Sequence, residues 1–134
     1  MNRRLRLLCA LPALVAAVPA YACTPAFKGA ATTESAHYTL AWRPDPAAIP
    51  VGGHFSLDLV VCPKTGAPLP QSLRVDAQMP EHRHGMNYKA TVSSEGAGRY
   101  RADGLMFHMP GRWELMFELR GRETERLLAE VMLK

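Results

Sequence analysis

Hydrophobic and polar residues alternate along most of the chain from residue 37 onward. The clearest example is the segment 112–120, where the aromatic and leucine side chains point one way and charged side chains, with Met116 among them, point the other. Because successive side chains of a strand point to opposite faces, this pattern predicts β-strands with one buried face. Seven strands are predicted in this way, over residues 37–42, 55–61, 73–77, 88–92, 100–102, 112–120 and 125–133.

The segments between the predicted strands are rich in glycine and proline, which is typical of turns. The last segment, 125–134, also contains good helix formers, so a helix is the alternative there. We favour a strand because a sandwich needs a closing edge. About seven short strands predict an all-β fold, an immunoglobulin-like antiparallel β-sandwich. The sandwich domain is expected over residues 37–134, after a flexible lead-in, residues 23–36, whose small and polar side chains show no periodicity.

The first 22 residues have the three parts of a cleavable signal peptide. Three arginines precede an apolar stretch, residues 7–18, which is too short to span a bilayer comfortably, and Ala20-Tyr21-Ala22 supplies a cleavage site. We therefore expect export to the periplasm. The rival interpretation is a lipoprotein with its anchor on Cys23, although Tyr21 is bulky where lipoprotein signals have a small residue.

Removal of residues 1–22 changes the charge and the cysteine count. The 16 basic residues become 13 against 12 acidic ones, so the net charge of the mature chain is +1. Such a charge does not indicate nucleic-acid binding, and no later segment is apolar enough for stable membrane insertion. Cys23 and Cys62 remain, and an oxidising compartment favours a disulfide between them. The alternative is two free thiols, with Cys62 buried.

Histidine and methionine concentrate in two short segments, 79–88 and 106–111. In an extended chain, His82, His84 and Met86 project from one side, and Gly85 lets the backbone turn to bring them together. Imidazole and thioether groups form a ligand set that suits copper, and thioethers favour Cu(I). The candidate metal ligands are His82, His84, Met86, His108 and Met109, with Glu81 as a partner that orients a histidine.

The two His- and Met-rich segments can also be interpreted without a bound metal. Met79, Met106 and Met116 fit core positions, and His108 fits a hydrogen-bonded strand end. His37 and His54 lie outside the cluster and are interpreted as ordinary strand-start residues. The chain has no nucleophile elbow, zinc-protease motif or phosphate loop, so we expect no enzymatic activity.

The stretches MPEHRHGMNY (79–88) and GRYRADGLMFHMPGRWELMFEL (98–119) resemble the YtkA-like domain family, which is related to FixH-type proteins. That resemblance covers roughly residues 37–133 and implies an immunoglobulin-like exported domain associated with copper handling or with assembly of respiratory oxidases. FixH-type members carry an N-terminal membrane helix where this chain has a cleavable signal. A weaker similarity to PCuAC-type periplasmic copper chaperones rests on the spacing between Met86 and His108.

These observations predict a periplasmic protein that binds a copper ion and acts as a carrier or assembly factor. Its partner would be a copper-accepting protein or a membrane-complex protein. The alternative is a metal-free interaction module that assists assembly of a membrane or respiratory complex. The sequence leaves open the oligomeric state and the oxidation state of the copper.

Overall fold

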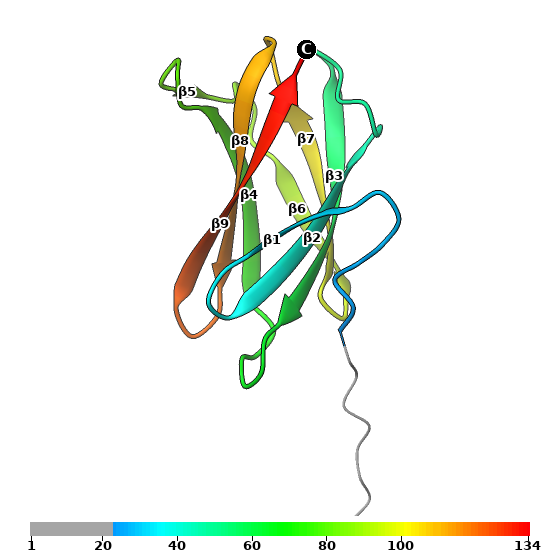
Figure 1. Cartoon of the computed structure of the whole chain (residues 1–134), viewed down its shortest axis with the longest axis vertical. Helices are drawn as coiled ribbons and strands as arrows, with labels where there is room; N and C mark the ends of the chain where they lie inside the picture. The colour runs from blue at the N-terminus through cyan, green and yellow to red at the C-terminus, as the bar shows by residue number, and fades with distance from the viewer. Residues whose placement is uncertain (1–22) are drawn as a thin grey trace, which may run out of the picture.

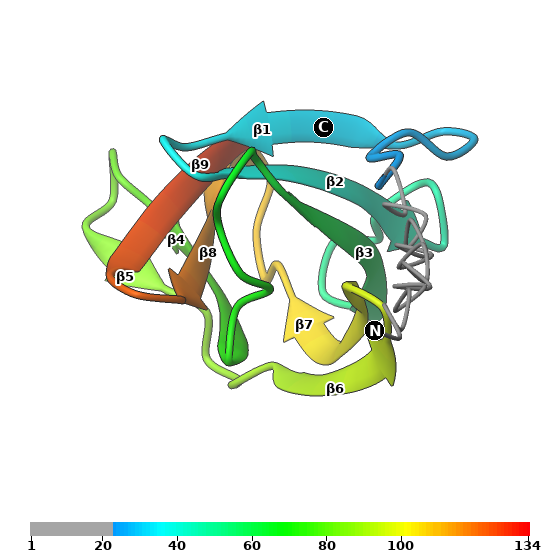
Figure 2. The same cartoon turned by 90° about the horizontal axis from the view of Figure 1, so that it is seen from below.

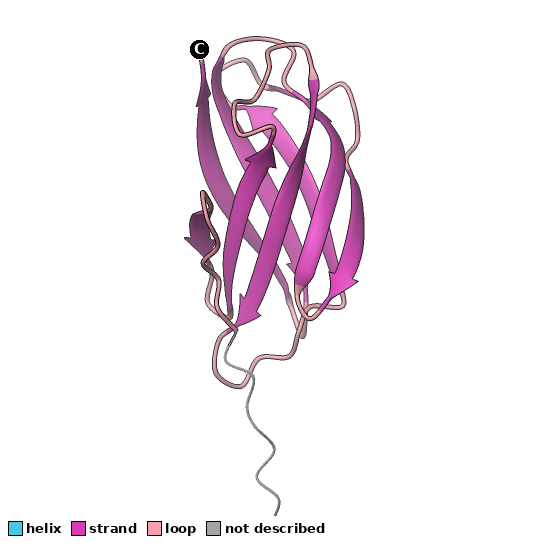
Figure 3. Ribbon diagram, turned by 90° about the vertical axis from the view of Figure 1, so that its right-hand side faces the viewer, coloured by secondary structure: helices cyan, strands magenta, loops and turns pink. Residues whose placement is uncertain are grey.

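The computed structural model describes residues 23–134, and the predicted signal peptide, residues 1–22, lies outside this range. Two antiparallel sheets pack face to face, as Figures 1 and 3 show. One sheet has the strand order β1-β2-β3-β7-β6 and the other the order β5-β4-β8-β9. The strands are β1 (Ala31–Glu34), β2 (Tyr38–Asp45), β3 (His54–Pro63), β4 (Ser72–Met79), β5 (His84–Gly85), β6 (Thr91–Gly96), β7 (Arg99–Met106), β8 (Gly111–Arg120) and β9 (Thr124–Leu133).

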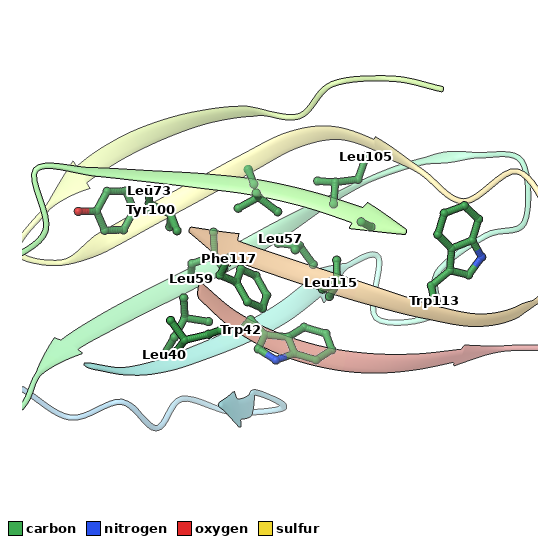
Figure 4. Close-up of a cluster of buried hydrophobic side chains, with 14 of the residues drawn as sticks. Leu40, Trp42, Leu57, Leu59, Leu73, Tyr100, Leu105, Trp113, Leu115 and Phe117 are labelled. Atoms are coloured by element: carbon green, nitrogen blue, oxygen red, sulfur yellow. The ribbon is translucent and has the colours of Figure 1, made fainter. Parts of the chain in front are cut away.

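The core lies between the two sheets and is built from the alternating apolar positions (Figure 4). Trp113, Leu115 and Phe117 of β8 are completely buried, and they face the inward side chains of β2 and β3. The residues of β8 between them point outward and are half-buried. The predicted all-β sandwich is therefore confirmed, and so is the predicted burial of the 112–120 alternation.

The C-terminal segment forms a strand, so the helix alternative is wrong. β9 pairs with β8 along its whole length, from Thr124 opposite Arg120 to Leu133 opposite Gly111. The hydrogen bonds and buried area of this pairing outweigh the modest intrinsic helix preference of the segment.

β1 and β5 were not expected from the sequence, and one of the predicted strands is displaced along the chain. β1 lies inside the predicted flexible lead-in, where its small polar residues form an edge strand against β2. Thr33 Oγ also donates a hydrogen bond to the carbonyl of Leu128, so β1 lies beside β9 and links the two sheets (Figure 2). The fourth predicted strand begins at Thr91 rather than Tyr88, because residues 86–90 carry the chain from one sheet to the other.

The disulfide between Cys23 and Cys62 is present, with the two Cα atoms 5.5 Å apart. The alternative of two free thiols is therefore wrong. Since Cys62 lies near the end of β3, the bond fixes the start of the described chain to the sandwich. No helix among residues 23–134 is long and apolar enough to span a bilayer.

The two ends of the sandwich differ in their side chains and are named here for use below. The His/Met pole contains the turn 80–83, the loop 107–110 and the strand ends beside them. The clamp pole lies at the other end of β8 and β9 and contains residues 64–71 and the turn 121–123. It is named for the contact between His37 and the carboxylate of Glu125, called the histidine clamp below.

Candidate metal site at the His/Met pole

The candidate site begins at the hairpin between β4 and β5. Met79 pairs with His84, and four residues, 80–83, form the turn between them. The backbone N–H of His82 donates to the carbonyl of Met79 at 3.1 Å, and Arg83 has a positive φ of 56°. The extended arrangement expected for 82, 84 and 86 is therefore wrong, because His82 lies in a tight turn and only His84 belongs to the short strand.

The structure nevertheless brings three imidazoles into a row. The ring centroid of His84 lies 4.9 Å from that of His108 and 5.7 Å from that of His82. His84 and His108 are half-buried, whereas His82 is exposed. His84 Nδ1 lies 3.2 Å from the carbonyl oxygen of Gly85. Because a carbonyl can only accept, this hydrogen bond places the ring proton on Nδ1 and leaves the lone pair on Nε2.

The alternative interpretation of His108, as a hydrogen-bonded strand-end residue, is wrong. Its Nδ1 is buried and has no hydrogen-bond partner within the described residues. Buried polar atoms without a partner are destabilising and uncommon in folded proteins, and the described chain has two others, Ser35 Oγ and Trp42 Nε1. The ring of His108 is held by packing against its neighbours, not by hydrogen bonds.

Trp113 forms the floor beneath the histidines. Its ring centroid lies 5.3 Å from that of His108 and 5.9 Å from that of His84, in edge-on arrangements. On another side it stacks on Phe107, with the centroids 4.4 Å apart. Trp113 Nε1 donates to the carbonyl of Met109 at 3.0 Å, which ties the loop 107–110 to β8. Sequence reasoning placed Trp113 in the core but missed its contact with the histidines, although the Met-Pro-Gly-x-Trp stretch marks it.

The methionines occupy different environments. Met86 is half-buried and borders, together with His84, an open hollow of about 650 Å³. Met109 is also half-buried, and both Met86 and Met109 pack against the core. Met79 is a buried core residue as predicted, and its Cε would lie only 2.7 Å from a Cβ placed on Gly111. The prediction that Met106 and Met116 fill the core is wrong, because both point outward and are half-buried.

Carboxylates do not complete the site. Glu81, expected to orient a histidine, instead accepts a hydrogen bond from Arg112 Nε at 3.1 Å. Across residues 23–134, no three His, Cys, Asp or Glu side chains are placed to hold one metal ion. A metal at this pole would therefore need a thioether ligand, and the two candidates are Met86, which lines a hollow together with His84, and Met109, which follows His108 in the chain.

The fold and this pole define a class of small disulfide-linked β-sandwich domain with imidazole and thioether groups gathered at one end. Residues 31–118 match the YtkA-like family, and the chain belongs to that family. The match ends before β9. A crystal structure of a DUF4426 family protein from Pseudomonas aeruginosa PAO1 has a similar fold, with a TM-score of 0.51 and 10% sequence identity. That similarity covers 81% of this chain and 99% of the other. No curated protein sequence matches the chain significantly.

Proposed function

We propose that this protein is an exported copper-binding protein that carries Cu(I) or assists assembly of a copper-containing complex. His84, His108 and Met86 are the main ligands in this proposal, with His82 and Met109 as further donors. The observation that carries it is the close pair of half-buried imidazoles, His84 and His108, above the ring of Trp113.

The chemistry of the donor set supports copper. Imidazole nitrogen suits copper and zinc, whereas thioether sulfur favours Cu(I) over harder ions. Neither His84 nor His108 forms an ion pair with a carboxylate in the described chain, so their ring nitrogens are not engaged by a competing charge. The Nδ1 of His108, which has no hydrogen-bond partner in residues 23–134, is a further nitrogen that a ligand could satisfy.

The disulfide supports the proposed compartment. Disulfides persist in oxidising environments and are rare where thiols are kept reduced. The bond between Cys23 and Cys62 therefore agrees with export through the N-terminal signal, and the periplasm is the compartment we propose.

A Cu(I) competition titration tests the proposal. Protein without its signal is titrated anaerobically against a chromophoric Cu(I) chelator. We expect the wild type to withdraw copper from the chelator, and the variant His84→Ala with His108→Ala to lose at least a hundredfold in affinity. The matched control is His37→Ala, which removes an imidazole at the clamp pole and should leave affinity unchanged. Circular dichroism confirms that each variant is folded.

Two outcomes would contradict the proposal. If the wild type withdraws no copper even from a weak chelator, the copper function is wrong. The metal-free interaction module then becomes the better candidate, and the open hollow beside His84 and Met86 is the surface that favours it. If the double variant binds like the wild type, the ligands are not these histidines.

A further inference from the structure

A second group of soft and aromatic side chains lies outside the site described above. It consists of His54 at the start of β3, Met106 at the end of β7 and Tyr88 in the segment 86–90. All three were assigned other roles from the sequence, His54 as a strand start, Met106 as a core filler and Tyr88 as a strand residue. The structure places His54 and Met106 on the outer face of the larger sheet and the ring of Tyr88 against that of His54.

His54 and Met106 are direct cross-strand neighbours. The two residues are paired in the antiparallel register of β3 and β7. Their chain neighbours Phe55 and Leu105 are buried in the core, so His54 and Met106 point to the outer face. Side chains at directly opposed positions have Cβ atoms about 4.5–5.5 Å apart, which allows an imidazole nitrogen and a thioether sulfur to reach one ion.

Tyr88 forms a wall beside this pair. Its ring meets the ring of His54 edge-on, with the centroids 4.9 Å apart, although Tyr88 itself is 49% exposed. An aromatic wall limits the positions of the imidazole without using either of its nitrogens. Asp103, on the same face, is held by Ser56 Oγ at 2.6 Å and Arg101 Nε at 3.0 Å. Both bonds go to Oδ1, so the charge of this carboxylate is already paired with Arg101, and the donors that face each other across β3 and β7 are nitrogen and sulfur.

We propose that His54 and Met106 form a second, weaker site for a soft monovalent cation, Cu(I), with Tyr88 as its wall. The inference rests on the proposed function only for the identity of the cation. Two protein donors leave the coordination of the ion open, so binding is weaker and exchange is faster than at a site with more ligands. Tyr88 follows Met86 by two residues, so the segment 86–90 borders both sites. Such a site suits the loading or release of the ion.

Ag(I), a redox-inert soft cation, allows a direct test by NMR in chloride-free buffer. Protein labelled with ¹³C at the methionine methyl groups is titrated with Ag(I). We expect the Met106 methyl and the His54 ring resonances to shift together, in a step that follows the one reported by Met86. Met132, which is 60% exposed, is the internal control for non-specific thioether binding and should shift only at much higher Ag(I).

Variants separate this site from the first one. His54→Asn with Met106→Leu should lower the Cu(I) stoichiometry from two to one and leave the tight equivalent unchanged. His84→Ala with His108→Ala should remove the tight equivalent and keep the Met106 shift. The proposal is overturned if Met106 and Met132 respond at the same Ag(I) concentration, or if the wild type binds a single equivalent that the His84/His108 variant loses. A wild type that binds one weak equivalent, reported by Met106 and not by Met86, would overturn the proposed function and leave this proposal standing.

Discussion

The two poles of the sandwich each hold histidine, but they use it differently. At the clamp pole, both the ring Nδ1 and the backbone N–H of His37 bond to the carboxylate of Glu125. The hydroxyl of Ser35 is buried near that carboxylate but does not meet the geometry of a hydrogen bond. At the His/Met pole, by contrast, His84 and His108 contact aromatic rings and each other.

This difference separates a structural histidine from one that is available to a ligand. A carboxylate fixes the ring of His37 and joins the start of β2 to the start of β9. The rings of His84 and His108 are positioned by packing and, for His84, by a hydrogen bond to the backbone carbonyl of Gly85, so a nitrogen lone pair on each ring is not committed to a carboxylate. The neighbours of an imidazole, more than its position in the sequence, therefore indicate which histidines can bind metal.

The largest expected loss of stability comes from removing the indole of Trp113, which lies beneath the histidines of the His/Met pole. Trp113→Ala deletes a completely buried indole, and we expect a loss of about 3–5 kcal/mol in the free energy of unfolding. Urea denaturation measures it. Trp113→Phe, which keeps a ring next to Phe107, is the matched control and should lose less than half as much. A loss under about 1 kcal/mol for the alanine variant would show that Trp113 does not support the core.

Removal of the disulfide near the clamp pole should have a similar effect. The bond joins residues separated by 39 positions, and restriction of the unfolded chain over a loop of that length contributes about 4 kcal/mol. We expect Cys23→Ala with Cys62→Ala to lower the free energy of unfolding by up to this amount. The variant should be insensitive to reductant, whereas the wild type should be destabilised by it. Alkylation of two thiols in freshly isolated wild-type protein would contradict the bond.

Breaking the histidine clamp should have a smaller, pH-dependent effect. The Ser35 hydroxyl, and next the ring and N–H of His37, hold the pKa of the Glu125 carboxyl below its usual range. A lowered pKa in the folded state adds stability that is present above the unfolded value of 4.5 and is lost as pH falls through the folded value. We expect Glu125→Gln to cost about 0.5–1 kcal/mol at pH 7.

The pH dependence makes this prediction specific. The difference in unfolding free energy between wild type and Glu125→Gln should shrink as pH is lowered below about 4.5, as thermal or urea unfolding at several pH values would show. A difference that is constant from pH 7 to pH 3 would mean that the variant perturbs packing and not the charged clamp.

The smallest effect is expected for a histidine of the candidate site. His84→Ala in metal-free protein removes no ion pair, and the hydrogen bond that it removes, from Nδ1 to the carbonyl of Gly85, is exposed to solvent. The free energy of unfolding should therefore change by no more than about 0.5 kcal/mol. Together with Glu125→Gln, this variant tests the comparison between the poles directly. A loss for His84→Ala larger than that for Glu125→Gln would show that His84, too, is a structural residue.

Most of the fold could be predicted because a strand's alternation of buried and exposed side chains is visible within a short stretch of sequence. Burial on one face of a strand forces the alternation seen at 112–120, and β8 follows it closely. β1 was missed because an edge strand of small polar residues needs no apolar face, and only its pairing with β2 defines it. Tyr88 alternates with Ala90 and Val92 yet precedes β6, since alternation cannot show where a chain crosses between sheets.

The candidate site was predictable only in part, because its contacts are not local. The density of His and Met correctly marked two segments that meet, and His84 does lie against His108. The tight turn at 80–83 was not visible, because Arg83 adopts a backbone conformation that few non-glycine residues favour. Nor could the sequence show that Arg112 binds Glu81, since that contact joins residues 31 positions apart.

The position of the chain ends has a practical consequence for handling the protein. The disulfide holds Cys23 beside β3 near the clamp pole, whereas Leu133 pairs with Gly111 at the His/Met pole. With 10 residues in β8 at about 3.4 Å each, roughly 30 Å separates the two. A polyhistidine affinity tag added after Lys134 would put competing imidazoles next to the histidines being assayed. Attachment through the N-terminal side would instead leave that pole facing free solution on a sensor chip.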